Sequence, residues 1–257
     1  MYKWWMAFLL LSLTTVSAQN KILPEEARGF VLPGYEMLDY VSGDINNDNR
    51  ADALLVLKQQ GEDSINAELM RPLLLLIRQP NGKLKKAVQN DSAILCYHCG
   101  GIFGDPYQEI SITKNGFDLN FYGGSSWRWS CQYSFSYDSL KKDWLLIREF
   151  QMSYHNTEPD ETQTETTIEK EELGVVRIGS FNANVNFGQT EWKVTAAKTF
   201  FYDNPKKGSK HRKGYLVKGD SVTSYRELTN FVKVYFTNKE ERSPSGFILK
   251  KDLIKIR

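Results

Sequence analysis

A short acidic loop, residues 43–52, has the residue types and spacing best suited to chemistry in this chain. Four oxygen-bearing side chains recur along it: Asp44, Asn46, Asp48 and Asp52. A hard cation such as Ca²⁺ binds about six to eight oxygens at ~2.3–2.6 Å, and alternate residues of a curled loop can direct their oxygens to one point. The backbone carbonyl of Arg50 would supply a further ligand. The loop therefore predicts a structural Ca²⁺ site.

The residues of the loop favour a metal site over a solvated turn and over an EF-hand. Three carboxylates this close in sequence repel one another when no cation is bound. A turn that only solvates a hairpin would not relieve this repulsion. Leu55 stands at the twelfth position, where an EF-hand needs glutamate. Asn49 occupies the sharp-turn position usually held by glycine, and asparagine tolerates the left-handed conformation.

The segment Gly43 to Leu57 resembles the calcium loop of the FG-GAP/VCBS repeats of integrin-like propellers. Those loops read D-x-[DN]-x-D-G-x-x-D and lead into an apolar strand, and this chain departs from the pattern at Asn49. Such propellers use several repeats, whereas one is found here. The resemblance implies a metal loop and not a propeller.

Three cysteines provide a second group of reactive side chains: Cys96, Cys99 and Cys131. An oxidising compartment would permit one disulfide and leave one thiol. Cys96 and Cys99 have the C-x-x-C spacing of redox motifs, but two glycines follow at once and no helical pattern succeeds them. We expect a structural disulfide or buried inert thiols, in preference to redox catalysis or a Cys/His zinc site.

A search for catalytic constellations yields one carboxylate pair, Asp105 and Glu109, which could serve glycoside hydrolysis. The three histidines stand in different segments, and no nucleophile elbow or phosphate-binding glycine loop occurs. Residues 99–107 and 122–127 form the densest cluster of glycine, aromatic and carboxylate residues. We expect any pocket of the first domain there, with Arg128 beside the two carboxylates.

The elements that must position these residues are β-strands, because short apolar runs alternate with turn signals at roughly 8–12-residue spacing. The predicted strands of an antiparallel, sandwich-like meander are 53–57, 73–77, 84–88, 109–113, 117–122, 127–137 and 144–152. In 127–137 one face is almost wholly aromatic and the other polar. We interpret the aromatic face as core rather than as a carbohydrate platform.

Charge and composition suggest two domains behind an export signal. Residues 1–18 read as a secretory signal peptide, and the rest of the chain has no apolar run long enough to span a bilayer. Residues 19–189 carry 16 basic and 24 acidic residues, whereas 190–257 carry 16 and 7. The division predicts a β domain (19–155), an acidic and turn-rich linker or long loop (156–189), and a C-terminal domain (190–257). The overall charge of +2 argues against a nucleic-acid partner.

The C-terminal segment resembles a bacterial SH3-like (SH3b) domain. The resemblance is carried by 213–220, by Phe231 to Phe236 and by the closing run 246–253. It implies a small barrel of five short strands that recognises cell-wall peptides or acts as a docking module. It also implies an aromatic groove, for which Tyr202, Tyr235 and Phe247 are the candidates. A basic loop, Lys206 to Lys213, would be a solvated loop or a contact for an anionic partner.

Taken together, these features predict an exported, calcium-stabilised binding or scaffold protein without catalytic activity, located in the periplasm or outside the cell. Its expected partner is a cell-envelope polymer or peptide, or another exported protein. The alternative is a hydrolase that acts on cell-wall or extracellular glycan through Asp105 and Glu109.

Overall fold

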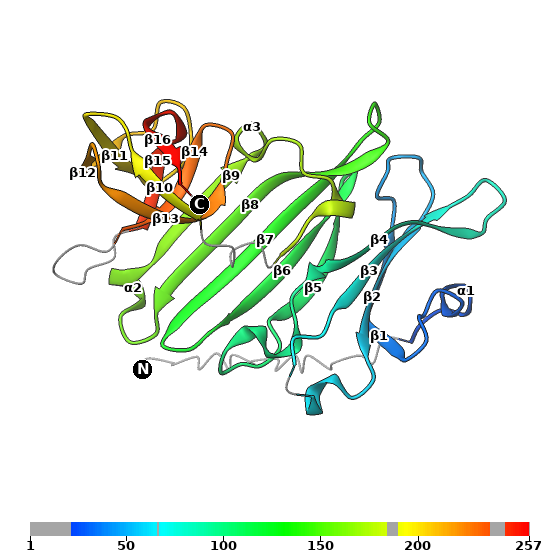
Figure 1. Cartoon of the computed structure of the whole chain (residues 1–257). Coiled ribbons are helices and arrows are strands. Elements are labelled where there is room, and N and C mark those ends of the chain that lie inside the picture. The colour runs from blue at the N-terminus through cyan, green and yellow to red at the C-terminus, as the bar shows by residue number, and fades with distance from the viewer. Residues whose placement is uncertain (1–21, 66, 184–189, 237–244, 257) are drawn as a thin grey trace, which may run out of the picture.

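The chain is all-β, as predicted, and is built from three antiparallel sheets (Figure 1). The computed structural model describes residues 22–256 except 66, 184–189 and 237–244, so the expected signal peptide lies outside the described residues. Within the described ranges the helices have at most four residues each, and none is long and apolar enough to cross a membrane.

The first sheet is a meander whose two faces are both covered. Its strands, in spatial order, are β1 (Tyr35–Gly43), β2 (Asp52–Gln59), β3 (Arg71–Arg78) and β4 (Leu84–Ile94). Leu54 and Val56 of β2 enter the main core, whereas Leu55 and Leu57 enter a smaller cluster closed by the N-terminal segment around Phe30. Two covered faces explain why β2 and β3 are continuous apolar runs.

The second sheet is a five-stranded meander with one apolar face. Its strands are β5 (Tyr107–Thr113), β6 (Gly116–Gly124), β7 (Trp127–Asp138), β8 (Asp143–His155) and β9 (Thr164–Glu169). Tyr133 and Phe135 of β7 lie in the main core, which agrees with the core interpretation for these two residues of the aromatic face, whereas Trp127 at the start of the strand is 55% exposed. Gln132 and Ser134 alternate with them on the polar face, as the twofold period of a strand requires.

The third sheet is formed by the C-terminal segment and has seven strands in the described residues rather than the five expected. In spatial order these are β12 (His211–Val217), β11 (Lys198–Tyr202), β15 (Ser245–Leu249), β14 (Phe231–Tyr235), β13 (Ser221–Glu227), β10 (Thr190–Val194) and β16 (Leu253–Lys255). The sheet curls around its own small core, to which Trp192, Leu216 and Val234 belong.

The short helical elements lie in the connections between strands. They are α1 (Glu25–Arg28), η1 (Glu62–Ser64), η2 (Tyr97–Gly100), α2 (Pro159–Thr162), α3 (Lys170–Leu173), η3 (Ile178–Ser180) and η5 (Lys250–Asp252). Buried Leu173 and Ile178, from α3 and η3, join the main core.

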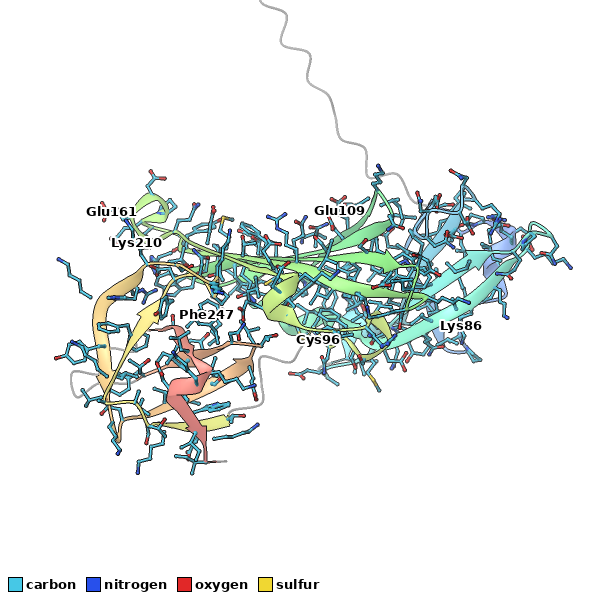
Figure 2. All side chains as sticks on the ribbon, turned by 90° about the horizontal axis from the view of Figure 1, so that it is seen from above. Lys86, Cys96, Glu109, Glu161, Lys210 and Phe247 are labelled. Carbon is cyan, nitrogen blue, oxygen red and sulfur yellow. A yellow bond between two sulfur atoms is a disulfide. The ribbon has the colours of Figure 1, made fainter. Side chains whose placement is uncertain are left out.

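The main core extends into the third sheet. Val232 and Ile248 point into the small core of that sheet, while their neighbours Phe231 and Phe247 join the main core with residues of the second sheet. Phe247 is 1% exposed. Figure 2 shows it between the third sheet and the second sheet. The two segments expected to be separate domains therefore share one apolar interface.

The described part of the acidic segment, residues 156–183, contains a β-strand. Its residues Thr164–Glu169 form β9, which pairs along β8 as the last strand of the second sheet. Ile168 is its buried apolar residue, and its polar neighbours occupy a sheet edge. This composition resembles a solvated loop, which explains why the sequence did not predict a strand there.

The shared core predicts a large effect of one substitution at its centre. Phe247→Ala should lower the free energy of unfolding by about 3–5 kcal/mol, because it leaves a cavity between the second and third sheets. Chemical denaturation followed by circular dichroism measures this value. Tyr215→Ala, which removes an exposed aromatic ring from the same sheet, should cost less than about 1 kcal/mol. Equal effects of the two substitutions would contradict the shared core.

Candidate functional site

The acidic loop between β1 and β2 brings three carboxylates together. Oxygens of Asp44, Asp48 and Asp52 lie within 4.8 Å of one another, so the group could hold a metal ion. Asn47 and Asn49 both have φ of +61°, a left-handed conformation that curls the loop. The conformation expected of Asn49 is thus confirmed. Hard oxygen donors gathered in this way fit a cation such as Ca²⁺.

The carboxylates of the loop differ in their surroundings. Burial works against ionisation of Asp44, but backbone amides, with that of Asn49 at 2.7 Å, outweigh it and lower the pKa of Asp44. Burial raises the pKa of Asp52, and the charges of Asp48 and Asp44 add to the increase. A bound cation would remove the repulsion that raises the pKa of Asp52.

The side chain of Arg50 already supplies positive charge to the loop. Its guanidinium forms an ion pair with Asp48, and its Nε donates a hydrogen bond of 3.0 Å to the carbonyl of Arg78. The sequence predicted a role for the backbone carbonyl of Arg50 and did not predict this ion pair. The guanidinium therefore contributes to the charge balance that a metal ion would complete.

Two anchors fix the loop to the core. Ile45 is fully buried, and its carbonyl accepts a hydrogen bond of 2.7 Å from the indole nitrogen of Trp144 in β8. Asp52 accepts hydrogen bonds from the backbone amides of Ile45 and Arg78. The loop thus joins the first sheet to the second, and anything that rigidifies it stabilises their junction.

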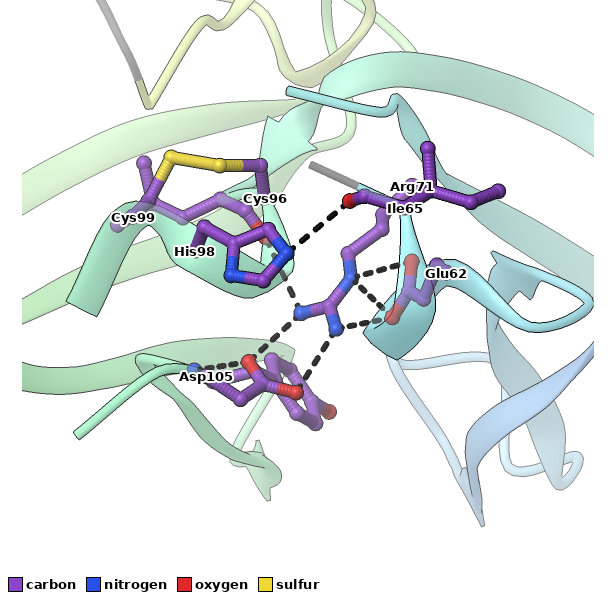
Figure 3. Close-up of a disulfide and its surroundings, with 9 residues drawn as sticks. Glu62, Ile65, Arg71, Cys96, His98, Cys99 and Asp105 are labelled. Carbon is purple, nitrogen blue, oxygen red and sulfur yellow. Dashed lines mark hydrogen bonds and ion pairs between the residues drawn. A yellow bond between two sulfur atoms is a disulfide. The ribbon is translucent and has the colours of Figure 1, made fainter. Parts of the chain in front are cut away.

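A disulfide joins Cys96 and Cys99 across η2, with a Cα–Cα distance of 5.2 Å. Cys131, the third cysteine, lies half-buried in β7. The bond agrees with the expected structural disulfide, and disulfides persist in oxidising compartments. Figure 3 shows it above a buried arginine, with His98 Nε2 at 3.0 Å from the carbonyl oxygen of Ile65.

That arginine, Arg71, holds Asp105. Arg71 is fully buried, and its guanidinium donates hydrogen bonds of 2.7 and 2.8 Å to the two carboxylate oxygens of Asp105 (Figure 3). It also forms an ion pair with Glu62, which is 2% exposed. Burial alone would lower the pKa of Arg71, but the two carboxylates outweigh this effect and raise the pKa. Asp105 thereby ties the segment that precedes β5 to β3.

Glu109 and Arg128, expected beside Asp105, have other contacts. Glu109 lies in β5, where its carboxylate accepts a hydrogen bond of 3.2 Å from Ser111. Arg128 places its guanidinium 4.3 Å from the ring centre of Phe103. In Figure 2 Glu109 lies on the side of the second sheet opposite Phe247. Asp105, Glu109 and Arg128 therefore have different contact partners in the structure.

The aromatic residues expected to form one groove are divided between two cavities. Tyr235 and Phe247 line a cleft of about 220 Å³ between the second and third sheets. Tyr202 lines a separate cavity of about 700 Å³ at the edge of the third sheet. Phe247 lines the cleft although it is buried, because its ring packs in the core shared by the two sheets.

The larger cavity collects positive charge. Four lysines line it, Lys206 and Lys207 from the basic loop and Lys250 and Lys251 from η5. Its acidic member, Glu172, is 6% exposed and accepts hydrogen bonds of 3.0 and 2.8 Å from Asn230. The η5 lysines belong to the closing run 246–253 of the SH3-like resemblance, and only the fold brings them beside the basic loop.

The buried arginine generates a prediction about stability. Arg71→Met should lower the free energy of unfolding by about 3–5 kcal/mol, because it leaves two carboxylates near one another without their cation. Arg71→Lys should recover part of the loss, since it restores charge but not the forked geometry. Arg28→Met, at an exposed ion pair, is the control and should cost less than about 1 kcal/mol. A similar stability of Arg71→Met and wild type would refute the structural role.

Comparisons with known proteins do not assign a family. No protein-family model, no curated protein and no solved structure matches this chain. The FG-GAP/VCBS and SH3-like resemblances therefore rest on the residues that suggested them. What the structure establishes is an all-β protein of three sheets with an aspartate triad that could bind a metal ion.

Proposed function

We propose that this is an exported binding protein without catalytic activity, which binds an anionic cell-envelope polymer through the lysine-lined cavity of its SH3-like module. The observation that carries the proposal is the gathering of four lysines and Tyr202 around one cavity of about 700 Å³. Ligand-binding cavities fall within roughly 300–1,000 Å³. The disulfide Cys96–Cys99 agrees with a location outside the cytoplasm.

The charge of the cavity favours an anionic partner. Lys206, Lys207 and Lys251 are exposed, so their ammonium groups can approach a ligand from solvent. Lys250 forms an ion pair of 2.6 Å with Glu227 and is partly neutralised. Tyr202 adds an aromatic surface beside the lysines. Lysines attract the acidic groups of a polymer, and a neighbouring aromatic ring can contact the apolar carbon atoms between those groups.

The remaining aromatic face of the module serves the protein itself. Phe231 and Phe247 pack against the second sheet, and Tyr235 lines the cleft between the sheets. In our proposal the module docks on its own chain through this face and keeps the lysine-lined edge for a partner. Asp105 has no catalytic part in the proposal, because both of its oxygens are bound by Arg71.

Calcium has a structural part in the proposal. Asp44, Asp48 and Asp52 would hold the ion, with Asn46 and the carbonyl of Arg50 as further oxygen donors. The bound ion would supply charge neutralisation. Because Ile45 ties the loop to Trp144, the ion would strengthen the junction of the first two sheets.

The calcium site predicts a metal-dependent stability. With a dissociation constant on the order of 10⁻⁴–10⁻³ M, calcium at about 10 mM should add about 1.4–2.7 kcal/mol to the free energy of unfolding. Asp48→Asn should remove this gain, whereas Asp91→Asn, an exposed aspartate in β4, should keep it. Thermal unfolding with calcium and with chelator provides the measurement. Identical curves for the wild-type protein in both solutions would rule out the site.

The lysine-lined cavity predicts salt-sensitive binding. A triple variant with Lys206, Lys207 and Lys251 changed to Gln should bind polygalacturonate at least about tenfold more weakly, a loss of about 1.4 kcal/mol. Added salt should weaken the wild-type complex, because exposed charges are screened. Isothermal titration against the polymer, with neutral dextran as a blank, measures both effects.

The control for this experiment removes the same number of lysine charges from a site outside the cavity. Lys83, Lys85 and Lys86 lie exposed on the β3–β4 hairpin, and their triple change to Gln alters the net charge equally. This control should bind like the wild type. If both triple variants lose the same affinity, general charge and not the cavity is responsible. If the wild type releases soluble sugar products, the absence of catalysis in the proposal is wrong.

A further inference from the structure

A second cavity lies between the second and third sheets, apart from the lysine-lined one. It measures about 220 Å³ and is lined by residues of both sheets. The second sheet contributes Trp129, Gln151 and Thr166 from its core-facing side, and the third sheet contributes Tyr235 and Phe247. We refer to this space as the interface cleft. Its walls combine flat aromatic rings with amide and hydroxyl groups.

Hydrogen bonds fix the polar groups of the interface cleft in place. Gln151 donates a hydrogen bond through Nε2 to the carboxylate of Glu149, which is 1% exposed. Its side-chain oxygen accepts a hydrogen bond of 2.8 Å from Lys233 Nζ. The chain Glu149–Gln151–Lys233 thus connects the two sheets and positions the ammonium group. Ser153 Oγ and Thr164 Oγ1, 2.9 Å apart, extend the polar wall.

Each cation around the interface cleft has a carboxylate near it. Lys233 donates a hydrogen bond to Gln151, whose amide in turn donates one to buried Glu149. Arg212 forms a salt bridge of 2.6 Å with Asp203. Glu165, an exposed acidic residue, is also among the residues that line the cleft. An anionic ligand would therefore find no excess of positive charge, whereas a neutral ligand that both donates and accepts hydrogen bonds would find partners of both kinds.

The size of the interface cleft limits the ligand to one small ring. Its volume corresponds to about seven water molecules and lies below the ~300 Å³ at which drug-sized pockets begin. Trp129, Tyr235 and Phe247 offer apolar ring surface, and the groups around them offer donors and acceptors. We propose that the interface cleft binds a single neutral sugar unit, with the apolar side of the sugar on Trp129 and its hydroxyls on Lys233 and Gln151.

Ligand-observed saturation-transfer NMR on the full chain tests this site, with glucose and N-acetylglucosamine as neutral probes and glucuronate as the charged probe. The wild type should transfer saturation to at least one neutral sugar and bind it more tightly than glucuronate. Trp129→Leu and Lys233→Met should each weaken that binding at least about tenfold. Trp127→Leu is the matched control, because Trp127 is 55% exposed at the end of the same strand and lies outside the cleft lining.

Each outcome decides the proposal. Absence of saturation transfer from the wild type to both neutral sugars overturns it, as does equal binding by Trp129→Leu and Trp127→Leu. Binding of glucuronate that is tighter than that of both neutral sugars contradicts the proposal that the ligand is neutral. If Trp129→Leu fails to fold by circular dichroism, Lys233→Met carries the test, since its aliphatic stem preserves the packing. The triple lysine variant of the other cavity should keep its sugar binding, which separates this site from the proposed polymer site.

Discussion

The apolar face of the second sheet is the constraint on which the rest of the structure depends. The strands β7 (Trp127–Asp138) and β8 (Asp143–His155) are long, and their inward side chains need cover along their whole length. The first sheet covers them through Leu54 and Val56, and the third sheet covers them through Phe231 and Phe247. Burial of apolar area is the main stabilising term in folding, so this double cover fixes the position of every candidate site.

Both cavities and the acidic loop follow from this arrangement. The interface cleft exists because the third sheet meets the second with polar as well as apolar residues. The acidic loop lies where the first sheet meets the second, with Ile45 inserted into the shared core. The lysine-lined cavity opens at the edge of the third sheet, beside Glu172 and Asn230. Stability and binding are thus coupled through one core, so a variant must be shown to fold before its binding is interpreted.

The sequence predicted the strands whose pattern was strong, including the edge strands β4 and β5, and missed the edge strands β1 and β9. The continuous run Ala53–Leu57 and the aromatic alternation of β7 were recognised, because burial on two faces leaves an unbroken apolar run and burial on one face leaves a twofold alternation. β9 was missed, since Ile168 is its one buried residue. The apolar triplet Phe247-Ile248-Leu249 signals a strand covered on both faces, and it could have predicted the interface. The partners of Asp105 could not be predicted, because Arg71 lies 34 residues away in the chain.

Native-state hydrogen exchange tests the shared core most directly. We predict that amides of Val232 and Ile248 in the third sheet open with the same free energy and denaturant dependence as those of Phe135 and Leu146 in the second. One cooperative unit would open them together. Exchange of Val232 and Ile248 through a lower-energy opening that leaves Phe135 and Leu146 protected would contradict the shared core, since the third sheet would then be an independent domain.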